Sequence, residues 1–523
     1  MKYSEHNFGR LRNFLWPIHR DEHKKLFPMF TLFFLISFVY NILRCMKVTL
    51  VVTADGSSAE VIPFLKVWAV FPGAILLTYI YTVLSNRLNR EQVFYAILSI
   101  FLGFFTIFMV FLHPHREALE LTSLSTMLQD NLPVWLKGLK GLIILIRHWH
   151  LTLFYVLSEL WSAIVLSMLF WGFANESTSV DEAKRFYAIF ALGANSSGIF
   201  SGQCAQFLTL DEFNPHLPFG TVAWEQSLIL QLAVVLIMGF GIAALFWWMN
   251  RRAIPSQIEK SSLILNKTNQ ANPVESKKLS LWECISQLIR SPYMLYIAII
   301  VVAYNLVYNL SDVLWTEQIR ERYPDASDFN AYINEIASIT GVFATISALL
   351  LSGNVIRRYG WTITAMITPA IWLATSIGFF GCLLFSNASF FSDVLAGLLG
   401  VPIYTLALMF GSMQICLGRA AKYTVFDESK EIAFIPLPKE DQRKGKAVVD
   451  GIASRFGKSG GSLLIQVLLI LCGELALTIP YVAAIFFVIL TLWIVAVRRL
   501  GKLASRDIDS EMQNLPDLAL SKS

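Results

Sequence analysis

Long apolar stretches separated by short polar ones dominate the pattern of this chain. A helix that crosses a bilayer needs about 20 mostly apolar residues. Twelve stretches reach roughly this length, at 26–44, 61–84, 92–112, 151–174, 186–208, 226–249, 291–312, 334–356, 361–385, 392–417, 449–472 and 476–497. They are too uniformly apolar for the alternating strands of a barrel. The pattern therefore predicts an all-α integral membrane protein with about twelve transmembrane helices.

The Lys and Arg residues between these stretches predict the orientation, because cytoplasmic loops carry an excess of both. With the N-terminus in the cytoplasm, 31 of the 42 Lys and Arg residues fall on that side and six on the other. We therefore expect both termini in the cytoplasm. The first apolar stretch continues for a full span without a small-residue cleavage site, which predicts a retained helix rather than a cleaved signal.

Composition agrees with a membrane protein. Charged residues make up 15% of the chain, against about 25% in soluble proteins. The net charge of +5 follows from loop cations that set the orientation, so it does not indicate nucleic-acid binding. The six cysteines form no CxxC pair, and we expect them to be reduced packing residues.

The longest polar break predicts a cytoplasmic linker between two six-helix halves. The expected organisation is an N-terminal half at 1–249, a linker at 250–290, a C-terminal half at 291–497 and a tail at 498–523. The halves resemble each other weakly, since Phe38–Arg44 matches Val302–Tyr308 at an offset of 264 residues (302 − 38). At a similar offset, Gly193–Gly198 falls opposite Arg455–Gly460. Transporters built from such repeats bind substrate near the midplane, between the repeats.

Four cations stand at the ends of two predicted spans. Arg44 and Lys47 end the first span on one helical face, and Arg455 and Lys458 stand at the start of the eleventh. Charges in hydrocarbon are expensive and normally face a protein interior or an aqueous path. With little anionic charge nearby, these cations indicate a polyanionic ligand such as a phosphate compound. The alternative for Arg44 and Lys47 is that they extend to the membrane interface, as cations at helix ends often do.

Three carboxylates and one further lysine complete the candidate set. Glu159 lies inside the fourth span and Asp312 at the end of the seventh, where a carboxylate serves as a cation partner or a proton carrier. Lys66 lies one turn into the second span, after Glu60, and the two side chains could pair across Pro63. A static ion pair that holds two helices together is the alternative for these charges.

No sequence pattern indicates an enzyme, a metal site or a cofactor. Gly457-Lys458-Ser459 resembles the end of a P-loop, but Ile452 stands where that pattern needs glycine, and no strand precedes it. The glycines of this run instead allow close helix packing or a kinked, partly opened span. A membrane enzyme acting on a phosphorylated lipid would also want intramembrane cations. It would normally carry a large soluble catalytic loop or clustered His and Asp residues, and neither is evident.

Motifs spread along the chain carry a family resemblance. They include Phe14–His19, Leu50–Ala54, Gly56–Lys66, Glu159–Trp161, Leu169–Asn175 and Gly457–Gly461. Together they resemble the ATP/ADP translocase family of nucleotide transporters, found in plastids and in obligate intracellular bacteria. The resemblance implies twelve spans in a fold like that of the major facilitator superfamily. It also implies functional charges at Lys47, Glu159, Asp312 and Lys458.

Departures from the family pattern concern the substrate. Members of the family exchange ATP for ADP or import nucleotides with protons. The exchangers usually carry acids beside the first-span lysine, where this chain has Cys45 and Val48. The seventh-span acid, usually Glu, is Asp312, and the Lys that follows it is Thr316 here. Because the charge balance beside the phosphate-binding cations changes, a broader or different nucleotide specificity with proton coupling fits at least as well as strict exchange.

Our prediction is a non-enzymatic transporter that moves nucleoside triphosphates or related nucleotides by alternating access. Proton-coupled net import and strict ATP/ADP antiport are the two modes, and a carrier of another phosphorylated metabolite, such as a sugar phosphate, is a remote alternative. The expected substrate-binding residues are Lys47, Lys458, Arg44, Arg455, Glu159 and Asp312, and those expected in coupling or gating are Glu159, Asp312, Glu60 and Lys66.

The expected partners are nucleotides of the ATP, GTP, UTP, CTP, ADP or NAD class, protons in the import mode, and membrane lipid. No nucleic acid, metal or cofactor is expected, and the default oligomeric state for this architecture is a monomer. The predicted location is the bacterial inner (cell) membrane, with the plastid inner envelope as the alternative.

Overall fold

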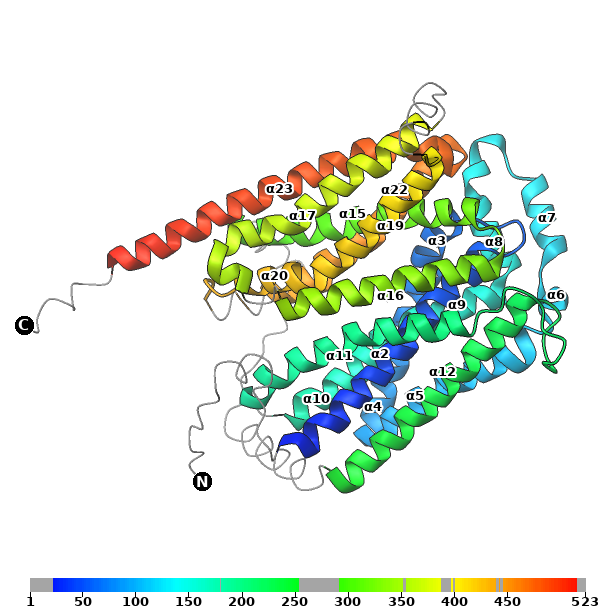
Figure 1. Ribbon diagram of the computed structural model, residues 1–523, viewed down its shortest axis with the longest axis horizontal. Helices are drawn as coiled ribbons and strands as arrows, with labels where there is room; N and C mark the ends of the chain where they lie inside the picture. Colours follow the sequence, from blue (N-terminus) through cyan, green and yellow to red (C-terminus); the bar gives the residue numbers. More distant parts are fainter. Residues whose placement is uncertain are drawn as a thin grey trace, which may run out of the picture. The chain divides into compact units, whose positions relative to one another are not determined.

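Long helices run through the described part of the chain, and no strand occurs in it (Figure 1). The computed structural model describes residues 22–253 except 179, and 291–514 except 351–353, 387–396, 398–399, 439–441 and 443–444. For these residues the predicted all-α class is confirmed.

Before the 254–290 gap, the α-helices include both long membrane-type helices and short connecting ones. They are α2 (His23–Val52), α3 (Val61–Phe64), α4 (Phe71–Arg87), α5 (Arg90–Ile107), α6 (Arg116–Leu119), α7 (Thr122–Asp130), α8 (Lys140–Arg147), α9 (Trp149–Trp161), α10 (Trp171–Ser177), α11 (Val180–Phe207) and α12 (Ala223–Trp248). π-helical turns continue several of them, namely η2 (Leu65–Val70), η3 (Phe108–Leu112), η5 (Ser162–Phe170) and η6 (Met249–Ala253), and η4 (Val134–Leu139) is a 3-10 helix.

After the gap, the described helices are longer on average. They are α15 (Pro292–Arg322), α16 (Ala326–Leu350), α17 (Asn354–Phe385), α19 (Ile403–Ala421), α20 (Asp427–Ala433), α22 (Ser454–Cys472) and α23 (Leu475–Asn514), with π-helical turns η7 (Lys422–Phe426) and η8 (Ala447–Ala453). The run named α17 bends at Gly360, whose positive φ of 78° is easily adopted only by glycine.

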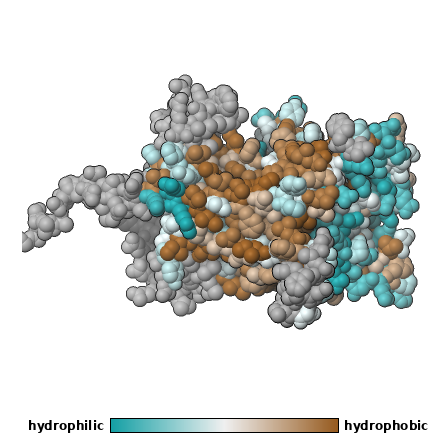
Figure 2. All heavy atoms as spheres, turned by 90° about the horizontal axis from the view of Figure 1, so that it is seen from above, coloured by the Kyte–Doolittle hydropathy of each residue, from teal (hydrophilic) through white to brown (hydrophobic). Residues whose placement is uncertain are grey.

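Ten helices in the described residues are long and apolar enough to cross a membrane. They coincide with ten of the twelve predicted spans. The other two predicted spans also contain helices, α11 and α19. Polar residues lower the apolar content of both: α11 contains Asn195, Ser196 and Ser197, and α19 contains Gln414 and Arg419. Apolar side chains cover the middle of the face seen in Figure 2, and hydrophilic ones gather toward one end of it.

Two compact units divide the chain, and their boundaries fall inside α2, α4 and α9. The described residues of unit 1 lie within Met1–Cys45, Ala74–Pro114 and Leu157–Glu275, and those of unit 2 lie within Met46–Gly73, His115–Val156 and Ser276–Ser523. The last turns of α2, together with α3 and η2, therefore pack with the C-terminal helices. Most of the predicted linker lies outside the described residues, and the division into two six-helix halves stays a prediction.

Aromatic side chains fill the core of unit 1. Phe33 of α2 packs on Phe170 with ring centroids 4.3 Å apart, and Phe94 of α5 stacks on Phe246 of α12 at 3.7 Å. The buried indole N–H of Trp161 donates a hydrogen bond to the main-chain oxygen of Ile36, 3.1 Å away. These contacts tie α2, α5, α12 and the α9–η5 helix into one body.

In unit 2, α15 lies at the centre and packs against α19, α22 and α23. Glycines on α22 permit the closest of these approaches. A Cβ atom added at Gly457 would lie 2.7 Å from Cβ of Asn305, and one at Gly461 would lie 3.1 Å from Cβ of Asn309. The helix is continuous through both glycines. Close packing, rather than an opened span, is therefore the role of these two glycines.

Candidate functional site

A group of charged and polar side chains surrounds Asp312 inside unit 2. We call Lys66, Tyr308, Asn309, Asp312 and Arg419 the Asp312 cluster. Lys66 Nζ lies 3.5 Å from Oδ2 of Asp312, and Arg419 Nη2 lies 3.6 Å from Oδ1. The Tyr308 hydroxyl donates a hydrogen bond to Oδ1 at 3.1 Å. One carboxylate thus stands between two cations.

Three separate elements bring the cluster together. Tyr308 and Asn309 lie near Asp312 on the surface of α15, because they precede it by four and three residues. Lys66 comes from the π-helical turn η2, and its Nζ also donates to Oδ1 of Asn309 at 2.7 Å. Arg419 comes from the last turn of α19, where its Nε donates to the Tyr308 hydroxyl at 2.9 Å.

The cluster is largely shielded from solvent. The side chains of Lys66, Asp312 and Arg419 are 23%, 19% and 12% exposed. Arg419 also lies over the Tyr308 ring, 5.2 Å from its centroid. Shielded charges interact more strongly than solvated ones, because less water screens them. Each cation therefore depends on the single carboxylate.

Lys458 lies next to this cluster on α22. Its main-chain oxygen accepts a hydrogen bond from the Asn309 amide, and its charge acts on Lys66. Lys422 and Arg455 lie within electrostatic reach of Lys458. The side chains of Lys458 and Arg455 are exposed, whereas Lys422 pairs with Asp427 at 3.2 Å. Cations therefore outnumber carboxylates in this part of unit 2.

Apart from Glu60, the remaining predicted cations and acids are Lys47, Arg44 and Glu159. Lys47 is buried, with its ammonium 4.8 Å from the ring centroid of Tyr155. Arg44 and Glu159 belong to unit 1, and the hydroxyl of Ser162 donates to the main-chain oxygen of Glu159. Among the predicted residues, the structure thus brings together Lys66, Asp312, Lys458 and Arg455.

Glu60 does not pair with Lys66, so the pairing across Pro63 that the sequence suggested is wrong. Its carboxylate instead accepts a hydrogen bond from the main-chain N–H of Leu475 at 2.8 Å. In return, Glu317 accepts one from the N–H of Ala59, also at 2.8 Å. Burial raises the pKa of Glu60 above its ordinary value; the hydrogen bond from Leu475 opposes this shift and the charge of Glu317 adds to it.

A cavity of about 780 Å³ opens beside Glu60, at the end of unit 2 that carries α7 and α8, which we call the α7 face. Its charged lining residues are Glu60, Lys137, Lys140, Glu317, Arg320, Glu321 and Glu474. Because both signs are mixed there, the cavity lacks the excess of positive charge found around Lys458. Its mixed charge does not favour phosphate.

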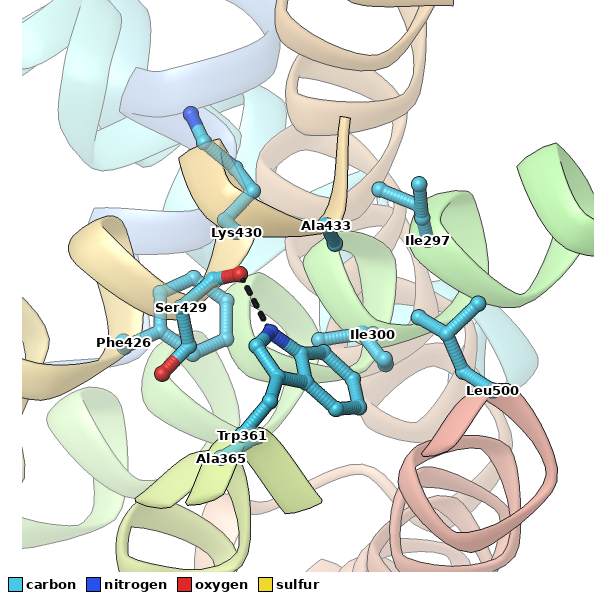
Figure 3. A pocket seen from close by; sticks show the side chains of 9 residues that line it. All are labelled: Ile297, Ile300, Trp361, Ala365, Phe426, Ser429, Lys430, Ala433 and Leu500. Carbon is cyan, nitrogen blue, oxygen red and sulfur yellow. Dashed lines mark hydrogen bonds between the residues drawn. The ribbon is translucent and has the colours of Figure 1, made fainter. Parts of the chain in front are cut away.

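A second cavity, shown in Figure 3, is small and apolar. Its volume is about 10 Å³, and the Trp361 indole N–H closes one side by donating to the main-chain oxygen of Ser429 at 2.8 Å. Such a space holds at most about one water molecule. It is a packing gap.

Four residues of this site were not predicted from the sequence, namely Arg419, Tyr308, Asn309 and Lys422. Arg419 and Lys422 were counted among the loop cations because the apolar stretch ends at 417. In the structure α19 continues to Ala421, so Arg419 is still helical and faces α15. A usable signal existed: Arg419 follows an apolar stretch without a turn residue other than Gly418, much as Arg44 and Lys47 end the first span.

Comparisons with known proteins agree with this architecture. The chain is 41% identical to ADP,ATP carrier protein 1 of Chlamydia trachomatis over 522 residues, covering 99% of this chain and 95% of that protein. It is 38% identical to the chloroplastic ADP,ATP carrier protein 1 of Arabidopsis thaliana, covering 94% of this chain and 76% of the relative.

Solved transporters share the fold at low identity. A D-xylose–proton symporter matches with a TM-score of 0.54 at 11% identity, over 92% of this chain and 97% of that one. A bacterial ferroportin homologue in an inward-facing state matches with a TM-score of 0.51 at 15% identity, over 92% and 98%. The expected fold, like that of the major facilitator superfamily, is confirmed. The family model described as TLC ATP/ADP transporter matches residues 1–503, and the chain belongs to this family of multi-pass membrane proteins.

Proposed function

We propose that this chain transports nucleotides across a membrane by alternating access. The observation that carries the proposal is the excess of positive charge around Asp312. The positive charges belong to Lys66, Arg419, Lys458 and Lys422, against the carboxylates of Asp312 and Asp427. Charges within spans are expensive and normally mark a substrate pathway. A nucleoside triphosphate, with about four negative charges near neutral pH, can offer one negative charge to each of these four cations.

The relatives support a nucleotide over another phosphorylated metabolite. Those named ADP,ATP carriers match this chain over nearly its whole length.

The exposed cations are the first proposed contacts for the phosphates. Lys458 and Arg455 are accessible, and Arg419 offers a planar fork that can hold two oxygens of one phosphate. Lys47, beside Tyr155, and Arg44 are proposed to contribute further positive charge. Glu159 is proposed to pair with these cations or to carry a proton in another state of the cycle.

Net import is the coupling mode we favour, and strict ATP/ADP exchange is the second candidate. The names of the relatives favour exchange. Cys45 and Val48 favour import, because neutral residues there leave the first-span lysine without the acids usual in exchangers. Cys45 is 1% exposed, so it adds packing rather than charge.

The orientation completes the proposal. Loop cations support an orientation with both termini in the cytoplasm, and in that orientation the α7 face and its cavity lie on the opposite side. The proposed location is the bacterial cell membrane, with the plastid inner envelope as the alternative.

Uptake by bacterial cells that express the chain tests the function. Labelled ATP, GTP, CTP, UTP and NAD would be supplied with and without a protonophore, and sugar phosphates would be added as unlabelled competitors. We expect saturable uptake of one or more nucleotides. Competition by sugar phosphates alone, with no nucleotide uptake, would overturn the proposal.

A matched pair of variants ties the uptake to the site. Lys458→Gln should lose uptake, because an accessible cation of the phosphate site is removed. Lys502→Gln, at an exposed position of α23, removes a lysine away from the cluster and should behave like the wild type. Equal uptake by both variants would separate transport from the cation cluster.

A further inference from the structure

Asp312 satisfies both cations of its cluster from within the protein. Its two oxygens face Lys66 at 3.5 Å and Arg419 at 3.6 Å. Phosphate oxygens and carboxylate oxygens are alternative acceptors for the same Lys and Arg groups. The Asp312 carboxylate therefore occupies the positions in which oxygens of a substrate phosphate would bind Lys66 and Arg419.

The Lys66–Asp312 pair also joins two parts of the chain. Lys66 belongs to the segment 46–73, and Asp312 belongs to α15 on the far side of the 254–290 gap. The same junction holds hydrogen bonds, from the Gln466 amide to the oxygen of Pro63 at 2.9 Å and from the Trp68 indole to Gln466 at 3.1 Å. Those bonds are neutral, whereas Lys66 and Asp312 pair two full charges.

An alternating-access carrier must separate such a junction to open and rejoin it to close. Rejoining buries Lys66, and a buried cation is costly unless an anion accompanies it. That anion is either a phosphate of the substrate or a carboxylate of the carrier itself. Here Asp312 supplies an anion on the opposite side of the junction.

We propose that Asp312 acts as an internal substitute for a substrate phosphate, so that the carrier closes its α7 face without a nucleotide. Lys66 and Arg419 are the cations that change partner, from carboxylate to phosphate and back. The unloaded return step is then permitted, and net nucleotide transport results. This inference rests on the proposed nucleotide transport and deepens it, because it assigns the coupling mode to named residues.

Purified protein in liposomes separates the two modes. Net uptake is measured as entry of labelled ATP into empty liposomes, with potassium and valinomycin to hold the voltage at zero. Exchange is measured as entry into liposomes preloaded with unlabelled ATP. The wild type is expected to show both, with net uptake within about tenfold of exchange, a difference of about 1.4 kcal/mol in the rate-limiting barrier.

Asp312→Asn keeps the shape of the side chain and removes its charge. We expect net uptake to fall by about tenfold or more relative to exchange, because only a nucleotide then neutralises Lys66 and Arg419 during closure. The double variant Lys66→Gln with Asp312→Asn removes a cation together with the carboxylate. It should restore the ratio of net uptake to exchange, even if both rates are lower.

A neutral junction contact provides the control. Asn330 Nδ2 donates to the hydroxyl of Thr49 at 3.1 Å, again between the segment 46–73 and a C-terminal helix. Thr49→Val should change both modes by the same factor, because the hydrogen bond that it removes joins two neutral side chains.

Three results would overturn the inference. They are exchange without net uptake by the wild type, an equal loss of both modes in inserted Asp312→Asn protein, and a double variant that still only exchanges. If Asp312→Asn protein does not insert into liposomes, the ratio of net uptake to exchange in the wild type and in the double variant tests the inference instead. A wild type that transports no nucleotide in either mode would instead remove the proposed function itself, so the two failures are distinguishable.

Discussion

Two contacts in unit 2 occupy related positions in the repeat but differ in charge. Lys66 reaches Asn309 and Asp312 on α15. The position 264 residues after Lys66 is Asn330 (66 + 264), which reaches Thr49 on α2. Thr49 in turn corresponds to position 313 (49 + 264), next to Asp312. The same junction therefore appears twice, once with a full ion pair and once with a neutral hydrogen bond.

The difference in charge between these two contacts indicates which of them a charged substrate can disrupt. A hydrogen bond between neutral side chains contributes about 0.5–1.5 kcal/mol and is indifferent to an anion nearby. A shielded ion pair competes directly with any phosphate that enters, because both offer oxygens to the same cation. At the offset of the predicted repeat the chain thus has two similar contacts, and we expect only the Lys66–Asp312 contact to respond to the charge of the substrate.

The largest expected effect comes from removing the cation at the charged contact. Lys66→Met leaves Asp312 with one of its two cations, and breaking one side of a shielded pair typically costs about 3–5 kcal/mol. We expect nucleotide uptake to fall by about 100-fold or more. Thr49→Val at the neutral contact should lose less than about tenfold. Uptake assays on matched amounts of inserted protein test both, and equal losses would break the comparison.

A smaller effect is expected when the fork of Arg419 is replaced by a point charge. Arg419→Lys keeps the positive charge but cannot bond Tyr308 through two nitrogens or lie over its ring in the same way. We expect the Michaelis constant for ATP to rise by about tenfold with a smaller change in the maximal rate. Tyr308→Phe should show part of this effect. An unchanged constant in both variants would remove Arg419 from the phosphate site.

Close helix packing gives a second comparison between positions that correspond in the predicted repeat. Gly457 and Gly193 are 264 residues apart, but an added Cβ meets Asn305 Cβ at 2.7 Å in the first case and the ring of Phe30 at 2.6 Å in the second. Asn305 Cβ moves only with the α15 backbone, whereas the Phe30 ring can rotate away. Overpacking usually costs about 1–3 kcal/mol.

Gly457→Ala should therefore lower the thermal stability of the detergent-solubilised protein. Gly193→Ala should lower it less, because the Phe30 ring can rotate away from the added Cβ. At both positions alanine favours the helix by about 1 kcal/mol over glycine, so this term does not change the comparison. Unfolding followed by a thiol-reactive dye or by tryptophan fluorescence measures both. A larger loss for Gly193→Ala would contradict the rigid contact between α15 and α22.

The spans were predictable from sequence because the bilayer imposes a length and a composition on each helix. Lys66, Asp312 and Lys458 were predictable as candidates because charges within apolar stretches are rare. Their partners were not, since Lys66 bonds Asn309 across 243 residues of sequence, whereas the nearby Glu60 was the natural candidate. Arg419 was not predicted, because hydropathy locates the end of a helix only to within a few residues.

The smallest predicted effect is a pH dependence at the α7 face. Burial raises the pKa of Glu60 from an ordinary value of 4.5, so the folded protein binds more protons than the unfolded one from that pH up to the raised value. Stability should therefore fall as pH rises through this window. Glu60→Gln cannot ionise and should lose that part of the slope, while it weakens the bond to Leu475.

Melting temperatures of detergent-solubilised protein, measured from pH 4.5 upward, test this dependence. The neutral contact again provides the matched control, because Thr49→Val removes no titratable group and should run parallel to the wild type. A Glu60→Gln curve that also runs parallel to the wild type would show that Glu60 titrates alike in both states. The carboxylate would then hold Leu475 without linking the α7 face to pH. The Lys66–Asp312 pair would remain as the charge-dependent contact, beside the neutral bond of Thr49.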